Sequence, residues 1–203
     1  MILNSNLYGI SHRDIVLAAY VTDVFNKNEA PLTDWDKFRE KGIITDLHQQ
    51  TTIDNVYAAG DCTVSHDCSS NTDRILALLP NAFMQGEVAG KNMAGEETLY
   101  LNAIPMNAIG FYGLHIITAG SYDGDEDITE DADKEIYKKL VFKDGLLKGF
   151  ILMGDVARAG IYTSMIKEQI PLTEVDLDLL RDKPQMMMFG KARREEKLAG
   201  KKH

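Results

Sequence analysis

The spacing of apolar residues predicts helices in the first part of the chain. Apolar positions recur at helical spacing over residues 12–25, and Ser11 with Asp14 three residues later is typical of a capping box. Pro31 then interrupts the pattern, and a second short helix is expected after it. We therefore expect residues 1–40 to form a helical N-terminal segment.

The central part of the chain changes from strand-like to helix-like patterns. Residues 43–61 contain short apolar runs and predict two strands, whereas residues 63–79 are rich in polar side chains and predict a loop. A helix is expected from about residue 81 to residue 93. Pro80 suits the first turn of that helix, and Gly95 is typical of a helix end.

The C-terminal half has strand patterns followed by one helix. Strands are expected at residues 111–120, 137–142 and 146–153, and a helix is expected at residues 157–169. Asp144-Gly145 between two strands predicts a hairpin, and Pro171 stops the helix. Strands covered by one helix predict an α+β unit.

The length, composition and net charge of the chain limit what kind of protein it can be and which partners it can bind. With 203 residues, 44% hydrophobic content and 26% charged residues, the chain is expected to bury one or two ordinary cores. A net charge of -9 argues against nucleic acid as a partner, because phosphate binding needs a cationic surface. No apolar run approaches the roughly 20 residues of a membrane helix, and the N-terminus does not resemble a signal peptide. We therefore expect a cytoplasmic protein with no membrane partner.

The candidate chemistry centres on Gly60 and Asp61. Residues 56–59 are apolar and small, and they predict a buried strand that ends at Gly60. Asp61 would then stand just past the carboxyl end of a strand, where open α/β sheets bind ligands, and its carboxylate is a strong acceptor for sugar hydroxyls. Taken alone, Gly-Asp is more often an ordinary turn than a binding site.

Two ordered motifs about twenty residues apart distinguish these alternatives. The chain reads G-I-I-T-D at residues 42–46, T-T at residues 51–52, V-Y-A-A-G-D at residues 56–61 and P-N-A-F-M-Q-G-E-V-A-G-K-N-M-A-G at residues 80–95. These motifs resemble the second flavin-binding segment of the pyridine nucleotide-disulfide oxidoreductase superfamily. They are similar to the branch that contains NADH:rubredoxin reductases, nitrite reductase flavin subunits and NADH oxidases.

The resemblance implies both a fold and a division into domains. It implies an α/β fragment of a flavin-binding Rossmann-like domain at residues 41–97, followed by a small rubredoxin-reductase-like α+β domain at residues 98–203. Residues 1–40 have no counterpart in the resemblance and stay unassigned.

The resemblance also implies a partial FAD site. The implied cofactor-binding residues are Gly60, Asp61, Leu79, Pro80, Asn81 and Ala82. Asp61 would accept a hydrogen bond from a ribityl hydroxyl, and the helix that begins near Pro80 would direct its N–H groups toward the edge of the flavin ring. Leu79 stands where the family often has Trp, which is a departure from the family pattern at the ring-edge contact.

The resemblance implies an enzyme that passes electrons from NAD(P)H through FAD to rubredoxin, a nitrite reductase centre, oxygen or a disulfide. However, the chain has no GxGxxG motif, whereas these enzymes carry two for their dinucleotides. We therefore expect the chain to be a C-terminal portion of such an enzyme that is inactive alone. We also expect it to form a homo-oligomer and to have an electron-acceptor protein as partner. The alternative is a non-catalytic module for dimerisation or docking.

Other features carry simpler expectations. Cys62 and Cys68 are separated by five residues and are expected to be reduced thiols, with a regulatory disulfide as the alternative. No spacing of candidate ligands indicates a metal site. The acidic run at residues 123–127 lacks the glycine and glutamate of a calcium loop and predicts a solvated loop. His115 is expected to be a core histidine, and the basic residues near the C-terminus predict a solvated helix or tail.

Overall fold

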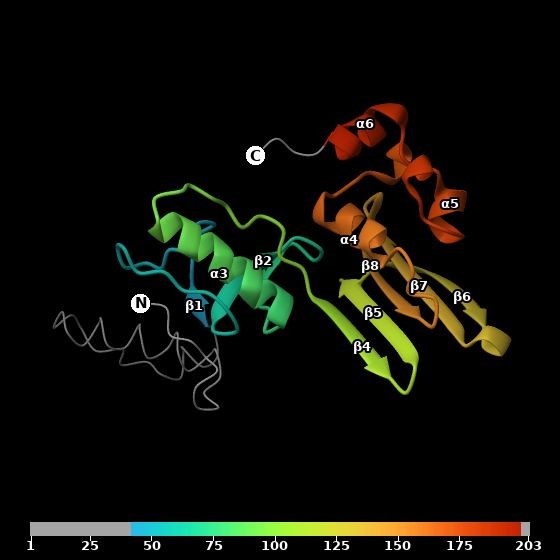
Figure 1. Ribbon diagram of the computed structural model, residues 1–203, viewed down its shortest axis with the longest axis horizontal. Helices are drawn as coiled ribbons and strands as arrows, with labels where there is room; N and C mark the ends of the chain where they lie inside the picture. Colours follow the sequence, from blue (N-terminus) through green and yellow to red (C-terminus); the bar gives the residue numbers. More distant parts are fainter. Residues whose placement is uncertain (1–41, 200–203) are drawn as a thin grey trace. The chain divides into compact units, whose positions relative to one another are not determined.

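The computed structural model describes residues 42–199, and the helices predicted within residues 1–40 lie outside this range. The chain divides into two compact units, Met1–Pro105 and Met106–His203 (Figure 1). In the described residues each unit has its own β-sheet, with three strands in the first and five in the second. The protein is therefore a mixed α and β structure.

The first unit consists of a small sheet and one long helix. Its elements are β1 (Ile43–Ile44), β2 (Thr63–Asp67), β3 (Thr72–Ile75) and α3 (Leu79–Met93). The strand order is β1-β2-β3, in which β1 runs parallel to β2 and β2 runs antiparallel to β3. A buried apolar cluster of this unit contains Leu76, Val88, Tyr100 and Ala103, with Met84 packed against it.

Two sequence predictions for this unit are wrong. The expected strand at residues 56–59 is an irregular segment with a single bridge, between Gln50 and Tyr57. The chain turns back sharply there, because the N–H of Thr51 donates to the C=O of Val56 at 2.8 Å, so no long ladder forms.

The expected polar loop at residues 63–79 contains the β2–β3 hairpin instead. Thr63, Ser65 and Asp67 of β2 are all buried. Polar side chains are buried at low cost when they find hydrogen-bond partners, and all three do so here. The partners come from elsewhere in the fold, so the local polar pattern hides the strand.

Helix α3 confirms the predicted helix, which begins two residues earlier than expected. Pro80 lies in its first turn, where a missing backbone N–H costs nothing. The helix is followed by Gly95, whose φ of 86° lies in the left-handed region that favours glycine.

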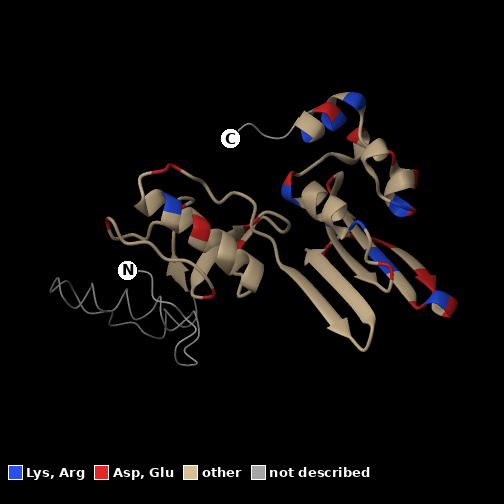
Figure 2. Ribbon diagram, in the orientation of Figure 1, with Lys and Arg blue, Asp and Glu red and all other residues tan. Residues whose placement is uncertain are grey.

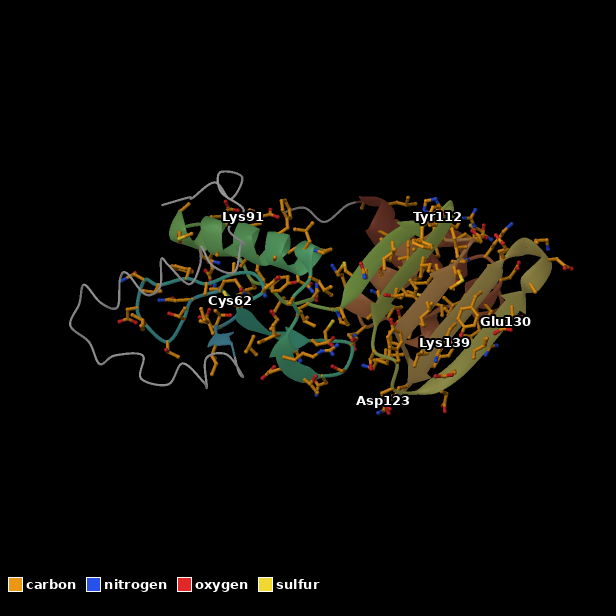
Figure 3. All side chains as sticks on the ribbon, turned by 90° about the horizontal axis from the view of Figure 1, so that it is seen from below. Cys62, Lys91, Tyr112, Asp123, Glu130 and Lys139 are labelled. Carbon is orange, nitrogen blue, oxygen red and sulfur yellow. The ribbon has the colours of Figure 1, made fainter. Side chains whose placement is uncertain are left out.

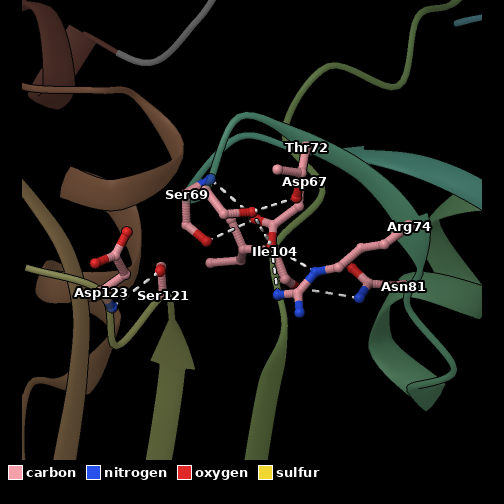
Figure 4. A network of polar contacts seen from close by, with 9 residues as sticks. Asp67, Ser69, Thr72, Arg74, Asn81, Ile104, Ser121 and Asp123 are labelled. Atoms are coloured by element: carbon pink, nitrogen blue, oxygen red, sulfur yellow. Dashed lines mark hydrogen bonds and ion pairs between the residues drawn. The ribbon is translucent and has the colours of Figure 1, made fainter.

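Asp67 is the centre of a buried polar network (Figure 4). It accepts hydrogen bonds from the backbone and hydroxyl of Ser69 at 2.9 and 2.6 Å, from Ser70 at 3.0 Å and from Arg74 Nε at 2.9 Å. Burial acts to raise the pKa of the Asp67 carboxyl, but the hydrogen bonds from Ser69, Arg74 and Ser70 together outweigh it and hold the pKa below its usual value. The carboxylate is therefore ionised in the folded protein at neutral pH.

We expect Asp67→Asn to lower the free energy of unfolding at pH 7 by about 2 kcal/mol, because hydrogen bonds to a charged group are lost. A lowered pKa in the folded state stabilises the protein above the unfolded pKa of about 4, and this stability is lost as the pH falls through the folded value. Urea unfolding at pH 7 and pH 3 should therefore show a smaller difference between variant and wild type in acid. Asp73→Asn, at an exposed position, is the matched control, and an equal Asp67→Asn effect at both pH values would contradict the assignment.

The second unit is built on one antiparallel sheet. Its strands are β4 (Met106–Phe111), β5 (Leu114–Gly120), β6 (Asp125–Asp131), β7 (Ile136–Lys143) and β8 (Leu146–Met153), in the order β4-β5-β8-β7-β6. Its helices are α4 (Ala159–Lys167), α5 (Leu177–Arg181) and α6 (Lys191–Ala199), with short 3-10 turns at Ala132–Lys134, Leu172–Glu174 and Met186–Met188.

Tight turns join neighbouring strands of this sheet. Asp144 and Gly145 connect β7 to β8 with φ values of 53° and 71°, which confirms the predicted Asp-Gly hairpin. Tyr112 and Gly113 connect β4 to β5 with φ values of 48° and 90°. Tyr112 is 97% exposed at this turn (Figure 3).

The acidic run corrects another expectation. Residues 125–127 belong to the edge strand β6, not to a solvated loop. The carboxylates of this region pair with cations: Glu126 pairs with Lys139, Asp123 with Lys143 at 2.7 Å and Asp127 with Arg181 at 2.6 Å (Figure 2). Strand β7 supplies the lysines that pair with Glu126 of β6 and with Asp123 just before it, and α5 supplies Arg181.

The core of the second unit lies where α4 packs against β8 and β5. The ring of Phe150 on β8 lies 5.4 Å from that of Tyr162 on α4, and both side chains are buried. The Tyr162 hydroxyl donates to the C=O of Leu180 at 2.8 Å, and burial raises its pKa. The predicted helix at residues 157–169 is thus confirmed, with slightly shorter bounds.

Two further expectations concern His115 and the basic residues near the C-terminus. His115 is exposed on β5 and is not a core histidine, because this part of the sheet is not covered within the unit. The basic residues 191–197 lie in α6, which agrees with the predicted helix, and the rest of the basic cluster lies outside the described residues. Ion pairs of Lys197 with Glu168 at 2.8 Å and of Arg193 with Glu174 at 2.7 Å connect this helix to the unit. The helix is therefore not a free tail.

Candidate cofactor-binding site

The turn that carries Asp61 is built on the backbone of Gly60. Gly60 is buried and has a φ of 96°, a conformation that side chains other than glycine rarely adopt. Its C=O accepts hydrogen bonds from the N–H and the hydroxyl of Thr63, at 3.0 and 2.8 Å. The turn therefore leads directly into β2.

This turn lies against the first part of α3, although the two are well separated in the sequence. A Cβ added at Gly60 would lie 3.8 Å from the Cβ of Ala82. The Gly60 N–H donates to the side-chain Oε1 of Gln85 at 2.7 Å. The structure thus brings together the two segments from which the sequence predicts cofactor contacts.

Asp61 has an available carboxylate. Its side chain makes no hydrogen bond or ion pair with any residue in the range 42–199, and the residue is half-buried. Asp67, in contrast, uses its carboxylate fully within the protein. Because an ionised carboxylate accepts several hydrogen bonds, Asp61 has the capacity to bind a ligand with hydroxyl groups.

The N-terminus of α3 provides the second feature of the site. The residue before the helix, Leu78, is extended and makes no side-chain cap, and no acidic residue lies in the first turn. Leu79 is 77% exposed and Pro80 is also exposed. The first N–H groups of a helix have no intrahelical acceptor and carry partial positive charge, so this end of α3 favours an electron-rich group.

Asn81 contributes differently from its neighbours. Its side chain is fully buried, where its amide donates to the C=O of Ile104 at 2.9 Å and its oxygen accepts from the Tyr100 hydroxyl at 2.8 Å. This side chain therefore anchors α3 in the first unit, and only the backbone N–H of Asn81 is left for a ligand.

Sequence reasoning missed the polar residues that support the turn, namely Thr63, Ser65 and Gln85. Gln85 is 1% exposed, and besides accepting from Gly60 it donates from Nε2 to the Ser65 hydroxyl. The helical spacing could have indicated that Gln85 is buried, because it lies one turn after Asn81 on the face of α3 that also carries the buried Val88.

Other candidate groups lie outside this arrangement. Cys62 is buried, and its thiol lies 3.8 Å from the C=O of Ala59, whereas Cys68 is half-buried and no disulfide joins the two. Over residues 42–199, no group of three or more His, Cys, Asp or Glu side chains is placed to hold a metal ion. Within the same range, no helix is long and apolar enough to cross a membrane.

Comparisons with known proteins match both units. Residues 105–170 match the rubredoxin NAD+ reductase C-terminal domain. The NADH-dependent phenylglyoxylate dehydrogenase subunit epsilon of Aromatoleum evansii is 34% identical over 140 residues, which are 66% of this chain and 33% of that protein. The NADH-rubredoxin oxidoreductase of Clostridium acetobutylicum is 28% identical over 120 residues, which are 58% of this chain and 30% of that protein. The chain thus spans about a third of the length of these relatives.

Solved structures show the same fold. The water-forming NADH oxidase of Lactobacillus brevis superimposes with a TM-score of 0.60 at 20% identity, over 76% of this chain and 38% of that one. An FAD-dependent pyridine nucleotide-disulphide oxidoreductase of Desulfovibrio vulgaris superimposes with a TM-score of 0.58 at 19% identity, over 66% of this chain and 37% of that one.

These matches agree with the predicted resemblance to the pyridine nucleotide-disulfide oxidoreductase superfamily. The match to the rubredoxin NAD+ reductase C-terminal domain covers residues 105–170 and so falls almost wholly in the second unit. The resemblance predicted from the two sequence motifs is therefore confirmed. The assignment of residues 41–97 to an FAD-binding domain stays a prediction.

Proposed function

We propose that this chain supplies one half of the flavin site of an FAD-dependent NAD(P)H oxidoreductase. The observation that carries the proposal is the contact between the Gly60-Asp61 turn and the first turns of α3. It places an available carboxylate and a helix N-terminus in one region of the first unit. The carboxylate can accept hydrogen bonds from hydroxyl groups, and the N–H groups at the helix N-terminus can donate to an electron-rich ring edge.

The residues of this region fit a flavin in their chemistry. Asp61 would accept from a ribityl hydroxyl, while the first N–H groups of α3 would face the pyrimidine edge of the ring. A bound flavin supplies hydride and electron transfer, and the protein binds and orients it. The exposed Leu79 and Pro80 leave the start of α3 open to such a ring. Negative charge that gathers at the ring edge would be stabilised by the helix N-terminus.

The other half of the site must come from further residues. The sequence contains no GxGxxG motif, so the turn that binds the dinucleotide pyrophosphate has to be supplied by another segment or chain. The relatives are named as NADH-dependent or NADH-rubredoxin enzymes. By analogy we expect NAD(P)H as electron donor and an acceptor protein as partner, in a homo-oligomeric cytoplasmic assembly.

The visible absorption spectrum of the protein, purified gently from its own cells, tests this proposal. We expect the absorption bands of a bound flavin in the preparation, together with any polypeptide that completes the site. Equilibrium dialysis of the purified chain against FAD then measures the contribution of this half alone. A colourless preparation that also takes up no FAD on dialysis would overturn the proposal in favour of a non-catalytic module.

A further inference from the structure

The backbone of Gly60 is held on both sides by buried side chains. Its N–H donates to Gln85 Oε1 at 2.7 Å, and its C=O accepts from the Thr63 hydroxyl at 2.8 Å. Gln85 is 1% exposed and Thr63 is 0% exposed. Desolvated polar groups are retained at such depth only when their hydrogen bonds are made, so these two contacts hold the peptide units around Gly60 in a defined orientation.

Gln85 links three elements through one side-chain amide. Its oxygen accepts from the Gly60 turn, its nitrogen donates to Ser65 on β2, and its backbone belongs to α3. Because both ends of the amide are used, its orientation is determined by its partners. A shift of the turn relative to α3 would break one of these buried hydrogen bonds.

The conformation of Gly60 explains why its backbone N–H needs a side-chain acceptor. With a φ of 96°, Gly60 does not take part in a strand ladder. The hydrogen bond to β1 is made two residues later, where the C=O of Cys62 accepts from the N–H of Ile43 at 2.7 Å. The Gly60 N–H therefore has no backbone acceptor among the described residues, and Gln85 supplies one.

We infer that Gln85 and Thr63 are positioning residues of the flavin site, which hold the Gly60-Asp61 turn at a set distance from the N-terminus of α3. The inference rests on the proposed function, in which one ligand contacts both Asp61 and the start of α3. Those contacts come from different elements, and binding to both requires that their separation is maintained before the ligand arrives. Both residues act through Gly60, without touching the cofactor.

Four variants of the full chain test this role by equilibrium dialysis against FAD. Gln85→Met removes both hydrogen bonds with little change in shape, and Thr63→Val removes the hydroxyl with little change in volume. Thr63→Ser keeps the hydroxyl, and Gln49→Met alters another buried glutamine, whose Oε1 has no hydrogen-bond partner among residues 42–199. We expect Gln85→Met and Thr63→Val to weaken FAD binding by roughly 5- to 10-fold, as the loss of one or two hydrogen bonds predicts. Thr63→Ser and Gln49→Met should stay within about twofold of wild type.

The Thr63 pair separates positioning from packing. If Thr63 acted only by filling space, Val would be harmless and Ser harmful, which is the reverse of the expected order and would overturn the inference. Amide hydrogen exchange gives a second readout without ligand, because the Gly60 N–H should exchange at least about 10-fold faster in Gln85→Met than in Gln49→Met. This readout and the Thr63 pair decide between the alternatives even if one variant folds poorly.

The results also separate this inference from the proposed function. If the native preparation is colourless and the wild-type chain also takes up no FAD on dialysis, the proposed function fails and the inference fails with it. If wild type binds FAD and both Gln85→Met and Thr63→Val bind it equally well, only the positioning role is overturned.

Discussion

Replacing Asp61 by Ala is expected to weaken FAD binding by roughly 10- to 100-fold, because a hydrogen bond to a charged group contributes about 1.5–3 kcal/mol. The side chain has no partner over residues 42–199, so its removal breaks no internal contact there. The effect should therefore appear in FAD affinity and not in stability. Equilibrium dialysis against FAD, with thermal unfolding of the same samples, measures both quantities.

Asp54→Ala is the matched control for this prediction. Asp54 is an exposed acid in the same unit, so the substitution changes the net charge equally without altering the turn at Gly60. Asp61→Asn adds a second comparison, since it keeps an acceptor oxygen and should bind FAD with intermediate affinity. An Asp61→Ala variant that binds FAD as tightly as wild type would exclude Asp61 from the site.

Gly120→Ala is expected to destabilise the second unit by roughly 3 kcal/mol or more, through left-handed backbone strain and overpacking. Gly120 ends β5 with a φ of 80°, and a Cβ built there would lie 2.0 Å from the C=O oxygen of Lys148 and 2.9 Å from the Cα of Gly149. The neighbouring atoms are backbone of β8, to which β5 is paired, so they cannot move aside without breaking the ladder. Calorimetry should show a fall in Tm of more than about 10 °C.

Gly113→Ala separates the two causes of this effect. Gly113 also has a positive φ, of 90°, but a Cβ there would meet no atom within 4 Å. We expect this variant to lose only about 1–2 kcal/mol, which is the cost of the left-handed conformation alone. Equal losses for Gly113→Ala and Gly120→Ala would show that the close approach of β5 and β8 is not the main cause of the destabilisation.

The elements that were predicted well are those with local causes. Pro80 and Gly95 act within single turns at the two ends of α3, and Asp144-Gly145 determines the conformation of its own hairpin turn. The two motifs that carry the family resemblance are also local, and the comparisons confirm that resemblance. In each case the physical reason is that the residues concerned restrict their own backbone.

The elements that were missed depend on partners distant in the sequence. Strand β2 is polar and buried because Gln85 of α3 and Arg74 of β3 satisfy its side chains. In the acidic strand β6, Glu126 pairs with Lys139 of β7 and Asp127 pairs with Arg181 of α5. A local pattern contains no information on such partners, so both segments resemble loops in the sequence.

For the candidate site, the amino-acid sequence establishes which residue types are present: a glycine that permits the turn, a carboxylate after it, and a proline at the start of a helix. The folded structure was needed to show that the turn and the helix touch, through Gly60 and Ala82, and that the Asp61 carboxylate has no internal partner within residues 42–199. It also showed that Gln85 holds Gly60, a contact between residues far apart in the chain. The reason is that side-chain burial and hydrogen bonding between separate elements are established only when those elements pack together.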